Sequence, residues 1–283
     1  MRTELDCLPC FFRQISRTLA YAGVNGDRGR AITRRAGSII EQASFDQAPA
    51  RVSTLLHRLI RTESGVDPYR QVKETYNRIA LEKLPEIRRR AHGTDRLAGS
   101  VRAAIAGNVI DFGIYDSVDL DRSLRDAFEL PLAETDYAAF SRAVQKADRI
   151  LYLCDNAGEI VFDLVLIETL RDLGKEVIAA VKGMPVINDA TLDDARSAGL
   201  HQYASDVIDN GNDGIGTLLE LCSERFLQEY RTADLIISKG QANYETLVQE
   251  HDARTFFLFI VKCPVVASSL QRKNGDIVLT TVR

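Results

Sequence analysis

Oxygen-bearing side chains follow two of the apolar runs in this chain. Asp155 and Asn156 come directly after RILYLC (residues 149–154), and Asp189 follows EVIAAV (176–181) within KGMPVINDAT. Carboxylate and amide oxygens suit hard divalent ions such as Mg²⁺ and Mn²⁺, which typically bind through one or two carboxylates plus a substrate phosphate. These residues therefore predict a metal site. An ordinary turn at Asp155–Asn156 and a helix N-cap at Asp189 would use the same residue types, so both alternatives stay open.

Two further segments could bind an anion. Lys239 follows the apolar run DLIIS, and a lysine at the end of a buried strand is expected to emerge at the ligand edge, where it can neutralise a phosphate. The glycine-rich segment DNGNDGIGT (209–217) ends in Gly216 and Thr217. If a helix begins there, its backbone N–H groups could face an anion. The segment matches neither nucleotide-binding glycine motif, so a flexible connection is the alternative.

Two of the five cysteines form a CxxC motif, Cys7 and Cys10. A zinc site needs four ligands, and the sequence holds no second such pair, although Cys263 could join them in space. A metal or redox role and simple helix packing are both compatible with this pattern.

The composition excludes several classes of protein. The chain has 283 residues, 45% of them hydrophobic and 27% charged, with a net charge of -4. This charge argues against a nucleic-acid partner. No apolar run has the length of a membrane span, and the first residues lack the apolar core of a signal peptide. Five cysteines are too few for a secreted disulfide scaffold. We therefore expect a cytoplasmic protein with no membrane partner.

The candidate residues must be positioned by an α/β fold. Residues 1–115 show helical periodicity, which predicts a helical region, and residues 116–283 predict a Rossmann-like three-layer domain with a mainly parallel sheet. The strand, helix, strand order around GEIVFDLVLIETLRDLGK indicates a βαβ unit, with an amphipathic helix from Glu159. Ligands of such sheets bind outside the carboxyl ends of the strands, where the candidate residues are expected to converge.

Taken together, the motifs resemble one known family. The chain resembles the DUF89 family of metal-dependent damage-control phosphatases, in the subgroup with an N-terminal CxxC that is also described as ARMT1-like. The matching segments, in family order, are CLPC, DPYRQVKETYN, AIAGNVIDFG, LCDNAGEIVFD, GMPVINDAT, DLIISKGQANYE and KCPVVA.

The resemblance implies a function and a set of site residues. Asp155, Asn156 and Asp189 would hold a divalent ion (Mn, Mg, Co or Ni), one of the two aspartates would act as nucleophile or orient the attacking water, and Lys239 would contact the phosphate. The substrates would be small phosphorylated metabolites, such as sugar phosphates or damaged phosphometabolites. The resemblance further places near the metal or substrate Asn108, Asp111, Glu159, Asn243 and Glu245.

Two other classes of function fit parts of the sequence. A Rossmann-like sheet could serve an S-adenosylmethionine-dependent carboxyl methyltransferase, although the glycine-rich turn expected after its first strand is missing here. A non-catalytic metal- or nucleotide-binding module would need the same aspartates without turnover. Metal-dependent release of phosphate separates the phosphatase from both.

Overall fold

A computed structural model describes residues 1–108, 128–129 and 132–282. The predicted site residue Asp111 lies outside these described residues. The α-helices are α1 Cys7–Tyr21, α2 Gly26–Glu41, α3 Pro49–Ser64, α4 Arg70–Ala91, α5 Arg96–Gly107, α7 Glu134–Lys146, α8 Glu159–Asp172, α9 Leu192–Ala198, α10 Glu224–Thr232, α11 Gln241–Leu247 and α12 Pro264–Leu270. The strands are β1 Arg149–Leu153, β2 Glu176–Val181, β3 Asp206–Asp209, β4 Leu235–Lys239, β5 Thr255–Ile260 and β6 Ile277–Thr281.

Within the described residues, the strands form one six-stranded sheet in the order β3-β2-β1-β4-β5-β6. All neighbours are parallel except β6, which pairs antiparallel with β5. From β1 the chain builds outward through β2 and β3, and then returns to the other side of β1 with β4. The sheet therefore has a topological switch point between β1 and β4, where open α/β sheets bind their ligands.

Helices cover both faces of the sheet. In β1, Ile150 and Tyr152 pack into the core cluster under α4, α5 and α8, whereas Leu151 and Leu153 pack into the cluster under α10, α11 and α12. Both faces of the strand are thus buried, which is why its sequence is continuously apolar. The predicted three-layer, mainly parallel α/β architecture is confirmed.

The helix predicted to be amphipathic is buried on all sides over most of its length. In α8, residues 159–167 are all buried, including the charged Glu159 and Asp163, and exposed side chains appear only in its last turn. The reason is that α8 lies between the sheet and the helices α4 and α5.

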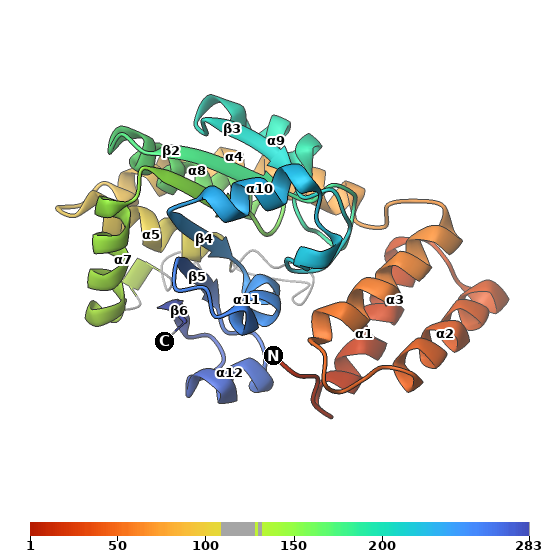
Figure 1. The fold of residues 1–283 in the computed structure, drawn as a ribbon. Helices are drawn as coiled ribbons and strands as arrows, with labels where there is room; N and C mark the ends of the chain where they lie inside the picture. The colour runs from red at the N-terminus through yellow and green to blue at the C-terminus, as the bar shows by residue number, and fades with distance from the viewer. Residues whose placement is uncertain (109–127, 130–131, 283) are drawn as a thin grey trace.

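The first three helices form a bundle of their own, which lies to one side of the sheet layers (Figure 1). Its core includes Phe11, Ile15 and Leu19 of α1, which recur at helical spacing along the sequence. Helices α4 and α5 pack instead on α8 and share the core of the sheet. The packing therefore changes between α3 and α4, earlier in the chain than the predicted boundary at residue 115, which itself lies outside the described residues.

Polar contacts hold the bundle against the sheet layers. Asp213, in the glycine-rich segment, is 1% exposed and forms ion pairs with Arg58 and Arg61 of α3. The Thr54 hydroxyl accepts a hydrogen bond from the backbone N–H of Ile215 at 2.9 Å. These contacts fix the bundle beside the carboxyl ends of the strands.

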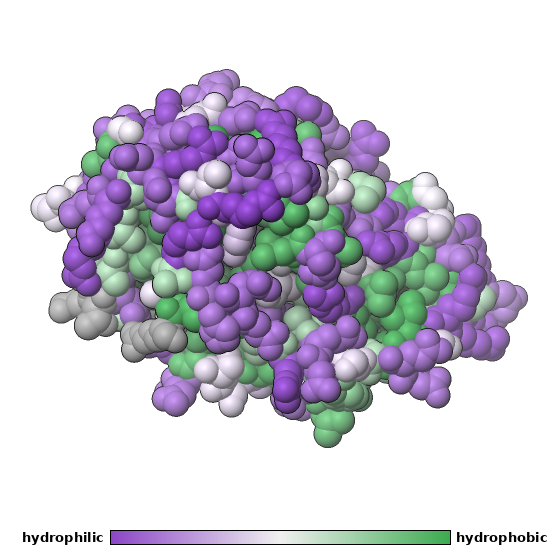
Figure 2. Space-filling view, viewed as in Figure 1, coloured by the Kyte–Doolittle hydropathy of each residue, from purple (hydrophilic) through white to green (hydrophobic). Residues whose placement is uncertain are grey.

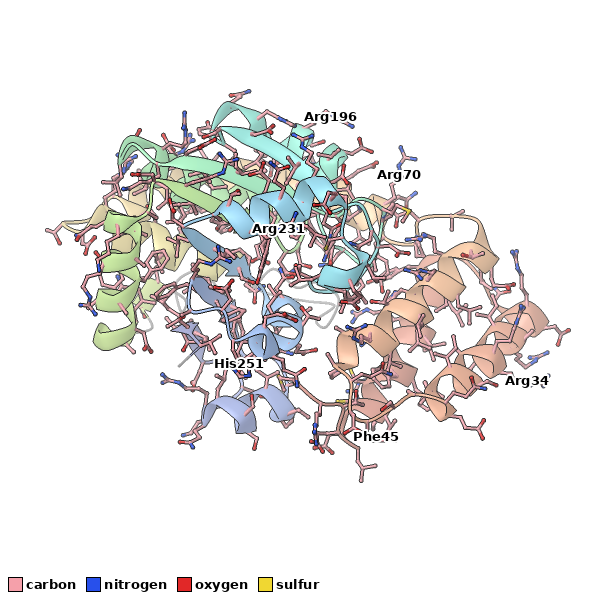
Figure 3. All side chains as sticks on the ribbon, in the orientation of Figure 1. Arg34, Phe45, Arg70, Arg196, Arg231 and His251 are labelled. Carbon is pink, nitrogen blue, oxygen red and sulfur yellow. The ribbon has the colours of Figure 1, made fainter. Side chains whose placement is uncertain are left out.

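The outer surface is mostly hydrophilic. Arg34, Arg70 and Arg196 project outward from their helices (Figure 3), and all three are exposed. The space-filling view also shows hydrophobic surface over the bundle (Figure 2), where Phe12 is 49% and Leu55 46% exposed. Within the described ranges, none of the helices is both long and apolar enough to cross a membrane.

Candidate active site

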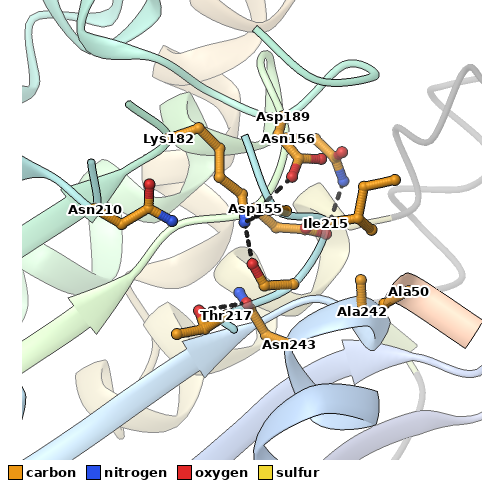
Figure 4. Close-up of polar contacts among 12 residues, drawn as sticks. Ala50, Asp155, Asn156, Lys182, Asp189, Asn210, Ile215, Thr217, Ala242 and Asn243 are labelled. Carbon is orange, nitrogen blue, oxygen red and sulfur yellow. Dashed lines mark hydrogen bonds and ion pairs between the residues drawn. The ribbon is translucent and has the colours of Figure 1, made fainter. Parts of the chain in front are cut away.

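The loops after β1 and β2 bring the predicted metal ligands together at the switch point. The backbone N–H of Ala190 donates to the carbonyl of Asp155, and that of Ala157 donates to the carbonyl of Asn188, both at 2.8 Å. Asn156 and Asp189 consequently form an isolated antiparallel bridge. Asp155, Asn156 and Asp189 lie side by side (Figure 4), each less than 10% exposed. The convergence predicted from the strand ends is present.

A buried layer of donors orients the Asp155 carboxylate. Its Oδ2 accepts hydrogen bonds from the amide nitrogens of Asn156 (2.8 Å) and Asn108 (3.1 Å). The same two nitrogens donate to Glu159 Oε2, at 3.1 and 2.8 Å. The Oδ1 of Asn108 accepts from the backbone N–H of Ile260 at the end of β5 (3.0 Å). Asn108 thus links three elements and lies behind Asp155 rather than in the cleft.

Close backbone packing at β4 also shapes this carboxylate. Gly240 has φ +83, and a Cβ built on it would lie 2.0 Å from Asp155 Oδ2. The position therefore requires glycine both for its backbone conformation and for the space. Ile187, just before Asn188 and Asp189, also has a positive φ of 43. Such a conformation is costly for a β-branched residue, and strain of this kind concentrates at functional sites.

Lys239 does not emerge at the ligand edge. It is the last residue of β4, 0% exposed, and its ammonium donates to Glu159 Oε1 (2.7 Å), Asp163 Oδ1 (2.5 Å) and the carbonyl of Ala104 (2.9 Å). The strand continues one residue beyond the apolar run, so that this side chain faces α8, where two acidic residues one turn apart receive it. In this structure Lys239 neutralises buried carboxylates instead of facing a phosphate.

This buried charge cluster has shifted protonation equilibria. Burial raises the pKa of Asp163 to about 6, while the Lys239 ammonium acts in the opposite direction. The pKa of Lys239 is raised because Asp163 and Glu159 together outweigh the effect of its burial. Asp163 also accepts a hydrogen bond from the Tyr152 hydroxyl at 2.7 Å.

A different lysine, which sequence reasoning missed, stands beside the predicted metal ligands. Lys182 follows β2, is 4% exposed, and its ammonium lies 3.5 Å from Asp189 Oδ2. It donates to the carbonyls of Gly214 (2.8 Å) and Gly216 (Figure 4). The signal was available in the sequence, because Lys182 directly follows an apolar strand.

The glycine-rich segment does not form the predicted anion cradle. No α-helix begins at Thr217 in this described part of the chain, where a short 3₁₀ turn (Leu219–Leu221) precedes α10. The N–H of Thr217 donates to Thr246 Oγ1, and its hydroxyl donates to Asn243 Oδ1. Gly216 directs its carbonyl at Lys182. Three other amides of the segment donate to its own Asp and Asn side chains in local turns, and the N–H of Ile215 donates to Thr54.

A cleft of about 420 Å³ opens over the predicted metal ligands. Its floor contains Asp155, Asn156, Asn188 and Asp189, and its opposite wall comes from α1 and α3 of the bundle. Cationic side chains also line it: Arg13 and Arg17 from α1, and Lys262 after β5. A pocket of this size accommodates a small phosphorylated molecule.

The predicted substrate-binding residues are divided between the cleft and the layer behind it. Glu245 lines the cleft, with a pKa raised by burial. The described lining of the cleft does not include Asn108, Glu159, Gly216, Thr217, Lys239 or Asn243, all of which are buried behind it. Asn243 holds β4 instead, because its amide nitrogen donates to the carbonyl of Lys239 at 2.7 Å.

Cys7, Cys10 and Cys263 meet at one side of the cleft as free thiols. Burial raises the pKa of the Cys7 and Cys263 thiols, which disfavours the reactive thiolate. Among the described residues, no group of three or more His, Cys, Asp or Glu side chains is placed to hold a metal ion. A metal or redox role for these three thiols stays a prediction.

The floor of the cleft has the chemistry that a divalent ion needs. The candidate ligands there are two carboxylates and one side-chain amide, so they do not form a group of three His, Cys, Asp or Glu side chains. The Asn156 amide nitrogen is held by Asp155 and Glu159, so that its carbonyl oxygen points away from them. Among the described residues, four carboxylates (Asp155, Glu159, Asp163 and Asp189) and two ammonium groups (Lys182 and Lys239) are buried in this floor and behind it. Oxygen ligands of the kind found at the floor suit a hard divalent cation.

Fold and site together define a three-layer α/β protein with a carboxylate cleft at its topological switch point. The damage-control phosphatase ARMT1-like domain model matches residues 3–278, and the chain belongs to this family. It is 37% identical to an uncharacterized protein of Methanocaldococcus jannaschii over 99% of this chain and 95% of that protein. It is 35% identical to a damage-control phosphatase of Pyrococcus horikoshii, over 98% of this chain and 97% of that protein. A crystal structure of a DUF89 family protein from Pyrococcus horikoshii superposes with a TM-score of 0.89 at 33% identity, covering both chains completely.

Proposed function

We propose that this protein is a divalent-metal-dependent phosphatase that hydrolyses small phosphorylated metabolites in the cleft between α1–α3 and the sheet. The observation that carries the proposal is the convergence of Asp155, Asn156 and Asp189 at the switch point, where all three side chains are buried. Relatives named damage-control phosphatases match nearly the whole chain, which supports phosphatase chemistry.

In this proposal Asp155, Asn156 and Asp189 hold the ion (Mn, Mg, Co or Ni). When bound, such an ion would polarise a phosphoryl oxygen and lower the pKa of a water molecule. Asn108 and Asn156 keep the Asp155 carboxylate in one orientation. A carboxylate so held can act as nucleophile or orient a water molecule for in-line attack, and both routes use the same geometry.

Charge on the phosphoryl group is neutralised by side chains of the cleft. Arg13, Arg17 and Lys262 line it and take the role that was predicted for Lys239. Such electrostatic stabilisation is the main contribution that proteins make to phosphoryl transfer. The bundle closes over the floor, which limits access of bulk water.

The experiment is release of inorganic phosphate from p-nitrophenyl phosphate and a panel of sugar phosphates, with each metal ion or with EDTA. We expect release with metal, none with EDTA, and a loss of at least about a hundredfold in Asp155→Asn, comparable to removing one transition-state contact. Asp276→Asn, at an exposed turn, is the matched control and should keep full activity. Release that is insensitive to EDTA and to Asp155→Asn would refute the proposal. Binding of S-adenosylmethionine without phosphate release would favour a methyltransferase.

A further inference from the structure

Helix α4 carries a buried polar side chain that bonds to both loops of the predicted metal site. Asn77 is 4% exposed and lies where α4 packs against α8 and α9. Its Oδ1 accepts a hydrogen bond from the backbone N–H of Gly158 at 2.7 Å, and its Nδ2 donates to Asp194 Oδ1 at 2.9 Å. The two partners lie 81 and 117 residues away in the sequence. One amide group thus joins three segments of the chain.

The first contact holds the loop between β1 and α8. Gly158 lies three residues after Asp155 and directly precedes Glu159, the first residue of α8. It has φ +79, and a Cβ built on it would lie 3.1 Å from the Tyr76 Cβ, so the loop and α4 approach each other as closely as a glycine allows. A buried backbone N–H requires a partner, and Asn77 supplies it from another helix.

The second contact holds the loop between β2 and α9. The Oδ2 of Asp194 accepts hydrogen bonds from the backbone N–H (2.9 Å) and the hydroxyl (2.7 Å) of Thr191, which lies two residues after Asp189. The ammonium of Lys73, one turn before Asn77 in α4, donates to the same oxygen at 3.1 Å. Lys73 and Asp194 are each 5% exposed, so this carboxylate is buried with its cation and fixed by four donors.

Asn77 acts on the metal ligands only through these loops. The two loops already meet at the floor of the cleft, in the bridge between Asn156 and Asp189. Asn77 joins them a second time behind the floor, because the described lining of the cleft includes neither Asn77 nor Asp194. Two separate connections determine how far apart the loops lie, whereas the bridge alone would leave them free to pivot.

We propose that Asn77 is a positioning residue of the metal site, which sets the separation of the Asp155 and Asp189 loops by bonding to both. This inference rests on the proposed metal site and adds a residue outside the cleft that determines its affinity. Metal–ligand distances are held to within about 0.2 Å, so a small shift of either loop weakens binding although all ligands are present. Lys73 supports this role by keeping Asp194 in place.

The first test is Asn77→Leu, which removes both hydrogen bonds at similar side-chain volume and without a change of charge. Two quantities are measured, the Kd for Mn²⁺ by titration calorimetry and the free energy of unfolding in urea with EDTA. We expect a Kd about tenfold weaker, at the lower end of the range for residues that orient metal ligands. Gln71→Leu, at an exposed position of the same helix, is the matched control and should bind Mn²⁺ like the wild type.

The second test reverses one hydrogen bond of Asn77. In the double variant Asn77→Asp with Asp194→Asn, position 194 donates and position 77 accepts, the bond to Gly158 is kept, and the net charge is unchanged. We expect its Kd for Mn²⁺ to lie within about threefold of the wild type, because the paired changes compensate each other. Asn77→Asp alone loses the donor. Its added negative charge would by itself strengthen cation binding, so a weaker Kd reports displaced loops.

The outcomes separate a positioning role from a purely structural one. An Asn77→Leu protein that is less stable than the wild type but has an unchanged Kd for Mn²⁺ would overturn the inference. A folded double variant with a Kd still about tenfold weaker would also overturn it, since every hydrogen bond is kept. If Asn77→Leu does not fold, Asn77→Asp decides instead: weaker binding that the double variant restores supports the inference, and unchanged or tighter binding overturns it.

Failure of this inference leaves the proposed function standing, because the wild type still binds Mn²⁺ and releases phosphate in each of these cases. A wild type that binds no divalent ion refutes the proposed metal site, and this inference falls with it.

Discussion

Lys239→Met tests whether this lysine balances buried charge or contacts the substrate. Its ammonium has three partners and is fully buried, as are Glu159 and Asp163. Methionine leaves both carboxylates without their cation, and removing one partner of a buried ion pair costs about 3–5 kcal/mol. For a chain of this size each kcal/mol lowers Tm by about 2–4 °C, so we expect a decrease of roughly 10 °C.

The size of this effect should depend on pH. The pKa of Asp163 is about 6 in the folded protein, above its ordinary 3.8, so the folded state binds this proton more tightly than the unfolded state. The contribution of Asp163 to stability is then fully present below about pH 4 and is lost as the pH rises through 6. Removing the lysine raises this pKa further. The destabilisation should therefore be larger at pH 8 than at pH 5.

The assay is urea unfolding at both pH values, with phosphate release measured on the same samples at a temperature where the variant is folded. Lys273→Met, at an exposed position, is the matched control and should unfold like the wild type. A Lys239→Met protein within about 1 kcal/mol of wild-type stability at pH 8, but without turnover, would refute the buried-charge role. That result would indicate instead that Lys239 contacts the substrate phosphate.

Three further variants test the floor of the cleft and its supports. Gly240→Ala places a Cβ against Asp155 and should lower metal affinity and turnover by at least about tenfold, whereas Gly275→Ala, with a similar φ of +93 but open space, should change neither. Asn108→Ala removes the donor to two buried carboxylates, and titration with Mn²⁺ should show affinity about 10- to 100-fold weaker; unchanged affinity would contradict its orienting role. Asp213→Asn should lower stability by about 1–3 kcal/mol at pH 7, because the arginines of α3 lose their carboxylate. Its folded pKa is depressed, so this difference should shrink as the pH falls through that pKa, and a pH-independent difference would argue against the ion pairs.

The convergence of Asp155 and Asp189 could be predicted because strand topology alone brings them together. Asp155 and Asp189 follow consecutive parallel strands, whose carboxyl ends lie at one edge of the sheet. This argument needs only the strand assignments, and those were recognisable as short apolar runs. The short β3 and the antiparallel β6 were not predicted: β3 has only two apolar residues between aspartates, and the three-residue apolar run of β6 was not recognised as a strand.

The role of Lys239 could not be predicted from its position at a strand end. The last side chain of a strand lies on one face of the sheet or the other, depending on the residue at which the strand ends. Strand β4 ends at Lys239 itself. A signal was present in α8, however, where Glu159 and Asp163 lie one turn apart in a segment (159–167) that is otherwise apolar. A buried acidic pair of this kind requires a buried cation, and reading the helix as amphipathic concealed that requirement.

The residues that form the wall of the cleft could not be predicted from the sequence, for a different reason. Helical periodicity identifies the inner face of α1, as Phe11 and Ile15 show, but it does not say which outer residues meet another part of the chain. Arg13, Arg17 and His57 reach the cleft only because the ion pairs of Asp213 fix the bundle beside the sheet. No pattern within α1 or α3 encodes that contact.

The most direct test of the central claim is a crystal structure with Mn²⁺ and the phosphate mimic tungstate, with both atoms located by anomalous scattering. We predict a manganese peak within about 2.2 Å of oxygens of Asp155, Asn156 and Asp189, with tungstate beside it in the cleft. Tungstate should also contact one or more of Arg13, Arg17 and Lys262. A manganese peak at another position, or tungstate bound outside the cleft, would contradict the assignment of this site.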